Sequence, residues 1–324
     1  MEMNFNVLLT SVGRRVSLVK FFKEALNGQG YVYSADCDPT APGLYVADRK
    51  FLVPRVTDKD YIPFLLDKCK KENIKLIIPL IDPELPILAQ ERENFLEKGI
   101  IPLVSSYETV MIGYDKLLTY RFLLENSFPS PKTSSFDKDL LEDKLDFPLI
   151  IKPRFGSASI GVQKCESYQD IEFYSRKISE PILQEFLQGD EVTLDVLCDF
   201  DGNPLSIVQR KRLKVRGGEV ERGITIKNNE LLSLALELVK RLKPFGVINI
   251  QCFLTSNGFY FTEINPRFGG GYPLTHYAGV NFPKLLIKLA KGERVEPLIG
   301  DYREGVLMLR YDEAIFINED ELLK

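Results

Sequence analysis

Short apolar runs alternate with helical patterns through the first hundred residues of the chain. Four runs are typical of strands, at residues 5–11, 31–36, 75–81 and 100–105. Between them, residues 15–26 and 83–99 carry apolar side chains at helical spacing. Strands that alternate with helices predict a parallel sheet covered by helices, and loops at the carboxyl ends of such strands face a crevice. Residues 1–110 are therefore predicted to form a Rossmann-like α/β domain.

The pattern changes beyond residue 110. A helix is predicted at about 114–126, and Pro129 and Pro131 prevent it from continuing. Further strand signals are separated by loops, at residues 147–153, 161–165, 181–187 and 191–213. The turn at 199–204 makes the last of these a hairpin, and a helix is predicted at 229–243. The second part is predicted to be mainly antiparallel, so the fold class is α/β followed by α+β.

The composition is that of a globular protein, with 44% apolar and 27% charged residues among 324. A net charge of -4 gives no reason to expect nucleic-acid or membrane partners. The amino terminus lacks the pattern of a secretion signal, and no segment has the roughly 18 consecutive apolar residues of a membrane span. Five scattered cysteines favour free thiols in a reducing compartment. A cytoplasmic protein that acts on small molecules is predicted, with a homodimer left open as its assembly.

Residues 247–265 are predicted to form a hairpin with one polar and one apolar face. A three-residue loop at 256–258 would pair Thr255 with Phe259. Cross-strand partners share a face, so counting outward gathers four polar side chains: Asn249, Gln251, Glu263 and Asn265. The opposite face is predicted to lie in the core, with Ile248, Ile250, Cys252, Leu254, Tyr260 and Ile264.

The polar face of this hairpin has two interpretations, a solvated sheet surface or a binding site. Glutamate, glutamine and asparagine offer hard oxygen ligands with limited negative charge, which suit magnesium shared with the phosphates of a substrate. Arg267 follows and could clamp a phosphoryl oxygen. The glycines beyond it, including Gly270 and Gly271, would let the backbone approach a substrate closely.

A second polar stretch begins where Lys152 ends an apolar strand. The loop that follows contains Gly156, Ser157, Ser159 and Gly161. Backbone N–H groups of such a loop can bind phosphate oxygens, with Lys152 as a point charge. The loop lacks the Gly-Lys-Ser/Thr sequence of a Walker A loop, and a plain hairpin turn is equally consistent. Lys116, in the first turn of the helix at 114–126, is either another phosphate ligand or a solvated lysine.

These segments, in this order, resemble the motifs of the ATP-grasp superfamily. The matching residues are Asp115-Lys116, Lys152-Pro153 with "FGSASIGV", "LQEFLQGDE", Gln251 and "EINPRFGGGYP". The chain is similar in particular to single-module proteins that correspond to half of the carbamoyl-phosphate synthase large subunit. The resemblance implies a pre-ATP-grasp domain at 1–110, a small or lid subdomain at 111–185, and a C-terminal subdomain with the metal site at 186–324.

The resemblance also implies which residues would bind ATP. Lys116 and Lys152 would hold the α- and β-phosphates, and the loop at 156–161 would close over the triphosphate. Glu191 would bind the ribose. The adenine contacts would come from the side chain of Gln184 and the backbone of Glu185, Phe186 and Leu187.

The implied metal ligands are Gln251, Glu263 and Asn265, which would hold two magnesium ions, with manganese as an alternative. Arg267 would stabilise the transferred phosphoryl group. This division of labour suits phosphoryl transfer, which needs positioning and charge neutralisation more than a protein nucleophile.

The substrate side of the site is less defined by sequence. Arg14 and Arg15 precede a predicted helix, where they are either exposed or contact a substrate anion. Asp82 and Glu84 follow a strand, and they either receive a substrate ammonium group or cap the next helix.

The densest basic run, residues 209–223, also has two interpretations. Arg210, Arg212, Lys214 and Arg216 would share one strand face, with Lys211 on the other. Either this is a charged edge strand, or Arg210 or Lys211 acts as a catalytic residue near the triphosphate or acyl phosphate. The match to carbamoyl-phosphate synthase is loose here, because the histidine that follows this strand in that family is replaced by Glu219 or Glu221.

The predicted activity is that of an ADP-forming, magnesium-dependent ligase. It would phosphorylate a small carboxylate and let an amine attack the acyl phosphate. Two alternatives remain: a carbamoyl-phosphate-synthase-like phosphorylation of bicarbonate, and an ATP-binding module without turnover. The single module and the missing histidine weaken the first alternative.

Overall fold

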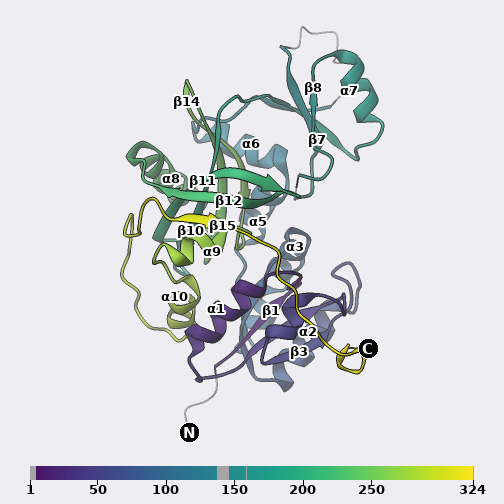
Figure 1. Cartoon of the computed structure of the whole chain (residues 1–324), viewed down its shortest axis with the longest axis vertical. Coiled ribbons are helices and arrows are strands. Elements are labelled where there is room, and N and C mark those ends of the chain that lie inside the picture. Colours follow the sequence, from purple (N-terminus) through teal and green to yellow (C-terminus); the bar gives the residue numbers. More distant parts are fainter. Residues whose placement is uncertain (1–4, 137–145, 158, 324) are drawn as a thin grey trace.

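The structure is a computed structural model that describes residues 5–136, 146–157 and 159–323 (Figure 1). It contains one parallel sheet near the amino terminus and two antiparallel sheets, which confirms the predicted fold class. Residues 137–145 of the predicted lid subdomain, and position 158 of the predicted phosphate loop, lie outside the described residues.

The first sheet has five parallel strands in the order β3-β2-β1-β4-β5. Its strands are β1 (Asn6–Thr10), β2 (Val32–Asp36), β3 (Arg49–Leu52), β4 (Ile74–Pro79) and β5 (Ile101–Pro102). The helical segments around it are α1 (Val16–Leu26), η1 (Pro42–Val46), α2 (Tyr61–Lys71), η2 (Asp82–Glu84), α3 (Leu85–Gln90) and α4 (Arg92–Leu96). The predicted helix at 83–99 is therefore wrong as one element. Two prolines, Pro83 and Pro86, each stand in the first turn of a separate segment, a position that suits proline.

The second sheet is small and antiparallel, with strand order β6-β9-β7-β8. Its strands are β6 (Thr133–Ser135), β7 (Leu149–Pro153), β8 (Gln163–Cys165) and β9 (Pro181–Glu185), and α7 (Tyr168–Ser175) accompanies them. Its own buried cluster is compact and includes Leu149, Ile151, Cys165, Ile171 and Leu183. Figure 1 shows this unit projecting beyond the rest of the molecule.

The third sheet has six antiparallel strands in the order β14-β13-β10-β11-β12-β15. Its strands are β10 (Asp190–Cys198), β11 (Pro204–Arg216), β12 (Glu219–Ile226), β13 (Val247–Thr255), β14 (Gly258–Asn265) and β15 (Leu307–Leu309). The remaining segments are α5 (Tyr107–Tyr114), α6 (Lys116–Glu125), α8 (Asn229–Leu242), α9 (Tyr272–Tyr277), α10 (Phe282–Ala290) and η4 (Glu319–Glu321). The apolar side of α8 packs on one face of this sheet and leaves the other face for polar residues.

The hairpin of β13 and β14 has the predicted pairs but not the predicted loop. Gln251 lies opposite Glu263 and Asn249 opposite Asn265, as predicted. However, Thr255 pairs with Gly258, so only two residues form the turn, and an irregularity next to Gln251 restores the register. The same shift buries Phe259 and Phe261 in the core instead of Tyr260, which is only half-buried.

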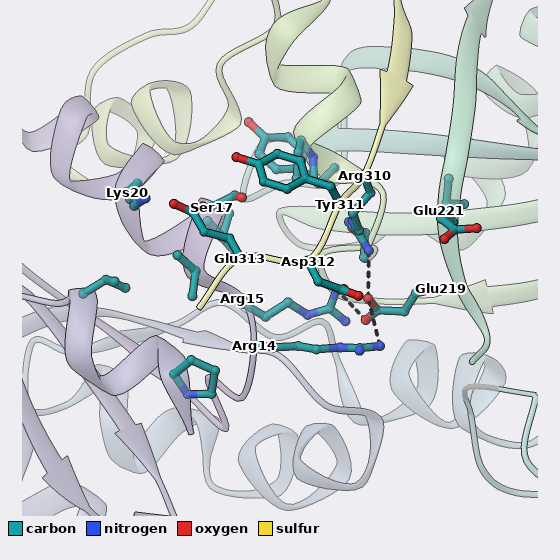
Figure 2. Close-up of a pocket in the computed structure, with 18 of the residues that line it drawn as sticks. Arg14, Arg15, Ser17, Lys20, Glu219, Glu221, Arg310, Tyr311, Asp312 and Glu313 are labelled. Atoms are coloured by element: carbon teal, nitrogen blue, oxygen red, sulfur yellow. Dashed lines mark hydrogen bonds and ion pairs between the residues drawn. The ribbon is translucent and has the colours of Figure 1, made fainter. Parts of the chain in front are cut away.

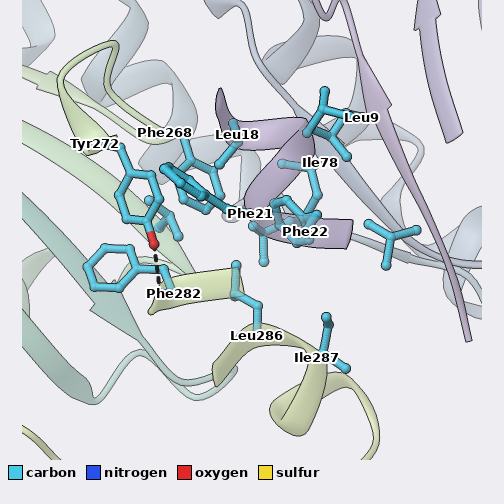
Figure 3. Close-up of a cluster of buried hydrophobic side chains, with 14 of the residues drawn as sticks. Leu9, Leu18, Phe21, Phe22, Ile78, Phe268, Tyr272, Phe282, Leu286 and Ile287 are labelled. Atoms are coloured by element: carbon cyan, nitrogen blue, oxygen red, sulfur yellow. Dashed lines mark hydrogen bonds between the residues drawn. The ribbon is translucent and has the colours of Figure 1, made fainter. Parts of the chain in front are cut away.

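The first and third sheets share one hydrophobic core (Figure 3). Phe21 and Phe22 of α1 lie among apolar side chains that come from both parts of the chain. The labelled members of this shared core are Leu9, Leu18, Ile78, Phe268, Tyr272, Phe282, Leu286 and Ile287. The Tyr272 hydroxyl also accepts a hydrogen bond of 2.8 Å from the Phe282 N–H. Phe268 directly precedes the three glycines and packs against Tyr272 in this core, so the start of the glycine run is anchored in the interior.

Four of the five cysteines are buried, Cys37 is exposed, and all five are free thiols. Over the described ranges, the structure has no helix with the length and apolar character needed to cross a bilayer.

Candidate functional site

Polar side chains cover the face of the six-stranded sheet that lies opposite α8. Asn249, Gln251, Glu263 and Asn265 stand on this face because they are cross-strand pairs of β13 and β14. β10 continues the row, since Thr193 is the partner of Gln251 and Asp195 is the partner of Asn249. The wet-surface interpretation does not fit, because Asn249, Asn265, Thr193 and Asp195 are all buried.

Glu263 and Asn265 line a small cavity against residues from other parts of the chain. The residues around it are Asp82, Gly113, Tyr114, Lys116, Thr119, Gly156, Glu263 and Asn265. Lys152 reaches the same place, with its Nζ 3.7 Å from Glu263 Oε1. The structure thus brings together two cations and two oxygen ligands that the sequence separates by more than a hundred residues.

Asp115 explains why Lys116 faces this cavity. The Asp115 side chain caps α6 by accepting a 2.9 Å hydrogen bond from the Leu117 N–H, so Lys116 is the first residue of the helix. Asp115 also accepts from Arg154 Nε at 2.9 Å, which ties the helix to the loop after β7. Lys116 Nζ donates to the Gly156 carbonyl at 2.8 Å. Burial lowers the pKa of Lys116, and nearby Lys152 lowers it further, while Glu263 opposes the shift.

The loop after β7 also has the backbone that its glycines suggested. Gly156 has φ of 114° and Gly161 has φ of 75°, and Ser159 shares the left-handed region with φ of 57°. A Cβ at Gly156 would meet open space, so the backbone conformation and not crowding requires glycine there. Ser157 is hydrogen-bonded to Asp82.

Arg267 is held by a carboxylate from the first sheet. Its Nε and Nη2 donate to Asp82 at 2.7 and 2.5 Å, in a fork-like pair between positions 185 residues apart. Burial alone would raise the pKa of Asp82, but the charge and hydrogen bonds of Arg267 outweigh it and bring the pKa below its usual range. Arg267 Nη2 also lies 3.4 Å from Asn265 Oδ1. Asp82 therefore orients Arg267 beside the predicted metal ligands, a role that the two sequence interpretations did not include.

The predicted adenine segment connects the second and third sheets. The Gln184 side chain is buried and donates to Thr133 Oγ1 at 2.8 Å. The Glu185 N–H already donates to the Lys132 carbonyl at 2.9 Å, so it is engaged within the sheet. Phe186 and Leu187 lie beyond the end of β9 in the connection to β10, and Lys164 stacks on the Phe186 ring.

Arg210 and Lys211 do not occupy the place predicted for them. Arg210 is fully buried and forms a bidentate ion pair with Asp195, to which its Nε and Nη2 donate at 2.8 and 2.9 Å. Lys211 points to the surface and pairs with Asp190 at 2.6 Å. Their neighbour Arg212 instead contacts Glu191, the predicted ribose ligand, and lies 3.5 Å from Gln251 Oε1. Arg212 is therefore the cation of this strand that borders the site.

Glu191 and Arg212 share a partly desolvated position. Burial raises the pKa of Glu191, the charge of Arg212 opposes this, and the carboxylate of Glu263 adds to the increase. Arg212 contacts Glu191 and also lies 3.5 Å from Gln251 Oε1, so it connects the predicted ribose ligand to a predicted metal ligand.

Each of the three glycines after Phe268 touches a different polar side chain. A Cβ at Gly269 would come within 2.6 Å of Asn249 Nδ2, and one at Gly271 within 2.1 Å of Arg210 Nη1. A Cβ at Gly270 would lie 2.6 Å from Arg15 Nη1 and 3.0 Å from the Glu219 carboxylate. Contacts this short do not occur for real side chains. Asn249 and Arg210 are buried and held by hydrogen bonds to Asp195, so glycine is required at 269 and 271, whereas the ends of the Arg15 and Glu219 side chains beside Gly270 are free to shift.

Arg14 and Arg15 line a larger cavity (Figure 2), whose wall also includes Gly269 and Gly270. Both approach Glu219, at 3.4 and 3.1 Å. Arg310, which follows β15, reaches the same carboxylate at 2.9 Å. No local pattern in the sequence indicates Arg310, because these residues come from three distant segments.

Glu84 does not contact this cavity or the smaller one. It is fully buried and accepts hydrogen bonds from the Tyr61 hydroxyl at 2.5 Å and the Ser11 hydroxyl at 3.1 Å. The prediction that Glu84 is a substrate ligand is therefore wrong, and its side chain caps no helix. Burial raises its pKa to about 7, although hydrogen bonds from Thr10, Tyr61 and Ser11 lower it.

We expect Glu84 to make stability depend on pH. The folded state holds this proton more tightly than the unfolded chain, so its contribution is complete below pH 4.5, the ordinary value, and is lost as pH rises to about 7. The free energy of unfolding of the wild type, minus that of Glu84→Gln, should fall by on the order of 3 kcal/mol between pH 4 and pH 8. Urea unfolding at several pH values measures this difference. Glu93→Gln, at an exposed position of the same region, should give a flat difference; a flat difference for Glu84→Gln as well would contradict the assignment.

The donor set of the small cavity fits magnesium bound together with phosphates. Gln251, Glu263 and Asn265 provide oxygen atoms but only one negative charge, and magnesium usually completes its shell with water and substrate oxygens. Among the residues that the structure describes, no group of three or more His, Cys, Asp or Glu side chains could hold a metal alone. In the described part of the chain, Thr193 Oγ1 and Arg212 Nε are buried without a hydrogen-bond partner. These two polar groups beneath the site are therefore free to bind a ligand.

Two family profiles match the chain, each over one part of it. The first, "PylC-like, N-terminal domain", matches residues 7–103. The second, "ATP-grasp in the biosynthetic pathway with Ter operon", matches residues 177–311.

Similar proteins carry carbamoyl-phosphate synthase names. The carbamoyl-phosphate synthase of Methanobrevibacter smithii is 26% identical over 271 residues, which are 78% of this chain and 72% of that protein. The carbamoyl phosphate synthase large chain of a Thermoanaerobacter species is 26% identical over 234 residues. That match covers 66% of this chain but only 22% of the longer relative.

Solved structures show the same fold at lower identity. An L-amino acid ligase from Bacillus licheniformis superposes with a TM-score of 0.71 at 20% identity, over 92% of this chain and 79% of that one. An N5-carboxyaminoimidazole synthetase from Staphylococcus aureus, complexed with ADP, gives 0.74 at 17% identity, over 91% and 80%. The chain thus contains an ATP-grasp domain, and its relatives are consistent with a module that corresponds to half of the carbamoyl-phosphate synthase large chain, which confirms the resemblance.

Proposed function

We propose that this ATP-grasp protein is an ADP-forming, magnesium-dependent ligase that activates a small carboxylate and joins it to an amine. The observation that carries the proposal is the small cavity, where Glu263 and Asn265 of the sheet face Lys116 and the Asp82–Arg267 pair. Oxygen ligands, cations and a fixed guanidinium are the groups that phosphoryl transfer needs. The ligase names of several structural neighbours support the same class.

In this reaction, a carboxylate oxygen of the substrate attacks the γ-phosphorus of ATP and the bond to the β-phosphate oxygen breaks. ADP leaves, and an acyl phosphate forms. The amine then attacks the acyl carbon, phosphate departs, and the amine loses a proton. Closure of the loop at 156–161 would keep water from the acyl phosphate.

The residues of the chain contribute charge and position. Lys116 and Lys152 would neutralise phosphate oxygens, and Arg267, oriented by Asp82, would face the transferred phosphoryl group. When bound, magnesium would supply further charge neutralisation and would be held by Gln251, Glu263 and Asn265. We assign the ribose to Glu191 with Arg212 beside it, and adenine to the segment from Gln184 to Leu187.

ADP release with Mg-ATP tests the proposal. Amino acids, other carboxylates and bicarbonate are supplied as separate pools, each with and without an amine. We expect an organic carboxylate to stimulate ADP release and the amine to increase it. Stimulation by bicarbonate alone would instead favour a carbamoyl-phosphate-synthase-like reaction, which the similarity to that enzyme keeps open. Tight ATP binding without stimulation by any pool would indicate a module without turnover.

A further inference from the structure

A cavity of about 290 Å³ (Figure 2) lies next to the glycine run, with Gly269 and Gly270 among its lining residues. Its walls come from the start of α1, from β12 and from the segment 310–315 that follows β15. Pockets for small molecules usually measure roughly 300–1,000 Å³, so this volume suits one small metabolite.

Three guanidinium groups converge on a single carboxylate in this cavity. Arg14, Arg15 and Arg310 lie 3.4, 3.1 and 2.9 Å from Glu219, as Figure 2 shows. Burial alone would raise the pKa of Glu219, but the three arginines outweigh it and lower the pKa. One carboxylate compensates one guanidinium, so the cluster keeps an excess of positive charge.

Arg15 shows that this excess is costly without an anion. Burial lowers the pKa of Arg15, Glu219 opposes the shift, and the charges of Arg267, Arg310 and Arg14 lower it further. Crowded, partly desolvated cations gain most from an additional carboxylate.

The other acidic residues of the cavity supply little of that compensation: the pKa of Asp312 is lowered mainly by Arg216, and Arg14 is the smallest of the influences on it. Asp312 is held by Arg216, through hydrogen bonds of 2.8 and 2.5 Å. Glu221 lies 2.9 Å from Lys214. Glu313 is exposed at the rim. The arginine cluster, defined as Arg14, Arg15 and Arg310, therefore presents an anion site toward the cavity.

The cavity adjoins the place assigned to phosphoryl transfer. Arg15 lies close enough to Arg267 for the two charges to interact. Gly270 separates the two regions: its carbonyl accepts a 2.6 Å hydrogen bond from Arg310 Nη2, and the neighbouring Gly269 packs on Asn249. The arginine cluster and Arg267 thus border the same glycine run, and their charges act on each other.

We propose that the arginine cluster binds a second carboxylate of the substrate, one that is not phosphorylated. The substrate class is then a small molecule with two carboxylates, or an acid with an additional anionic group. This inference rests on the proposed function, because only that function makes the bound molecule a substrate. Binding at the arginine cluster can be tested without turnover.

Thermal unfolding with dicarboxylates tests the site. The wild type is heated with millimolar malonate, succinate, glutarate or adipate, and with butyrate or glutaramide as controls that lack the second charge. At least one dicarboxylate should raise the midpoint by about 2 °C or more, butyrate should raise it less because it carries one carboxylate, and uncharged glutaramide should leave it unchanged. Arg15→Met and Arg310→Met should each lose this shift. Arg222→Met removes the same charge from an exposed position of β12 outside the cavity and should keep it.

Mg-ADP separates the two proposals. Its own stabilising effect on the wild type, Arg15→Met and Arg310→Met should be similar, which also shows that the variants are folded. No effect of Mg-ADP on any protein would count against the proposed function and not against the anion site. A dicarboxylate shift that persists in both arginine variants, or no shift with any acid in the wild type, would overturn the anion site.

Discussion

Replacing Glu263 with glutamine should reduce ADP release at least about a hundredfold, since charge stabilisation by a bound metal is worth several kcal/mol in the transition state. The substitution keeps the shape of the side chain and removes the single negative charge among the three predicted metal ligands. Its partner Lys152, 3.7 Å away, would then meet phosphate oxygens without a balancing carboxylate. ADP release is measured with whichever carboxylate pool supports turnover, over a range of magnesium concentrations.

The fold should survive this change. Glu263 is half-buried at the cavity, so the midpoint of thermal unfolding should stay within about 2 °C of the wild type. Glu237→Gln makes the same chemical change on the exposed side of α8, where Glu237 pairs with Lys240, and should leave turnover unaltered. Turnover of Glu263→Gln within threefold of the wild type would mean that Glu263 is not a metal ligand.

Asp195→Asn should cost about 3–5 kcal/mol of unfolding free energy, because it leaves the Arg210 charge buried without a counter-ion. Asp195 accepts from Arg210 through two bonds, from Asn249 Nδ2 at 2.7 Å and from Thr275 Oγ1 at 2.5 Å. An asparagine has one acceptor oxygen and directs an NH₂ group at other donors. Urea unfolding measures the loss.

Asp190→Asn is the matched control, because Asp190 and Lys211 form an ion pair between the same two strands, β10 and β11. That pair is exposed, so its loss should cost less than about 1 kcal/mol. Asp195→Leu combined with Arg210→Met should be more stable than Asp195→Asn, since removing both charges leaves no unpaired ion. A loss below 1 kcal/mol for Asp195→Asn would show that the fold tolerates the buried Arg210 charge without its counter-ion.

The sequence predicted elements well where the side-chain pattern is local. Alternation of strands and helices was enough for the parallel sheet, and the polar and apolar alternation of β13 was enough to pair Gln251 with Glu263. The predicted length of that hairpin loop was wrong. A three-residue turn gives the same pairs at Gln251 and beyond as a two-residue turn followed by an irregularity, so the polar pattern could not tell them apart. The sequence analysis missed β3 and α2. β3 has only four residues with no clear alternation, and in α2 Pro63 and several charged residues interrupt the helical spacing of apolar side chains.

The sequence was enough to predict the metal ligands of the site. It was not enough to predict the residues that support them. The oxygen-rich face has a recognisable composition on one hairpin, whereas Asp82 contacts Arg267 across 185 residues. Nothing local distinguishes the buried Arg210 from the exposed Lys211 next to it, because their difference arises from Asp195 and Asp190 on the facing strand. The Glu219 cluster likewise exists only once three segments have met. The predicted domain boundaries stay predictions, and so do the ligand roles other than those of Glu84, Arg210 and Lys211.

The shared core of Figure 3 restricts how this protein could be rebuilt from parts. In sequence the Rossmann-like unit looks separable, yet Phe21 and Phe22 of its first helix are enclosed by Phe268, Tyr272 and Phe282. A fragment cut near residue 110 would expose that aromatic surface to water, and so would the remainder of the chain. Exchange of this unit between related proteins, as in a domain-swapping library, therefore requires its partner helices α9 and α10 to be transferred with it.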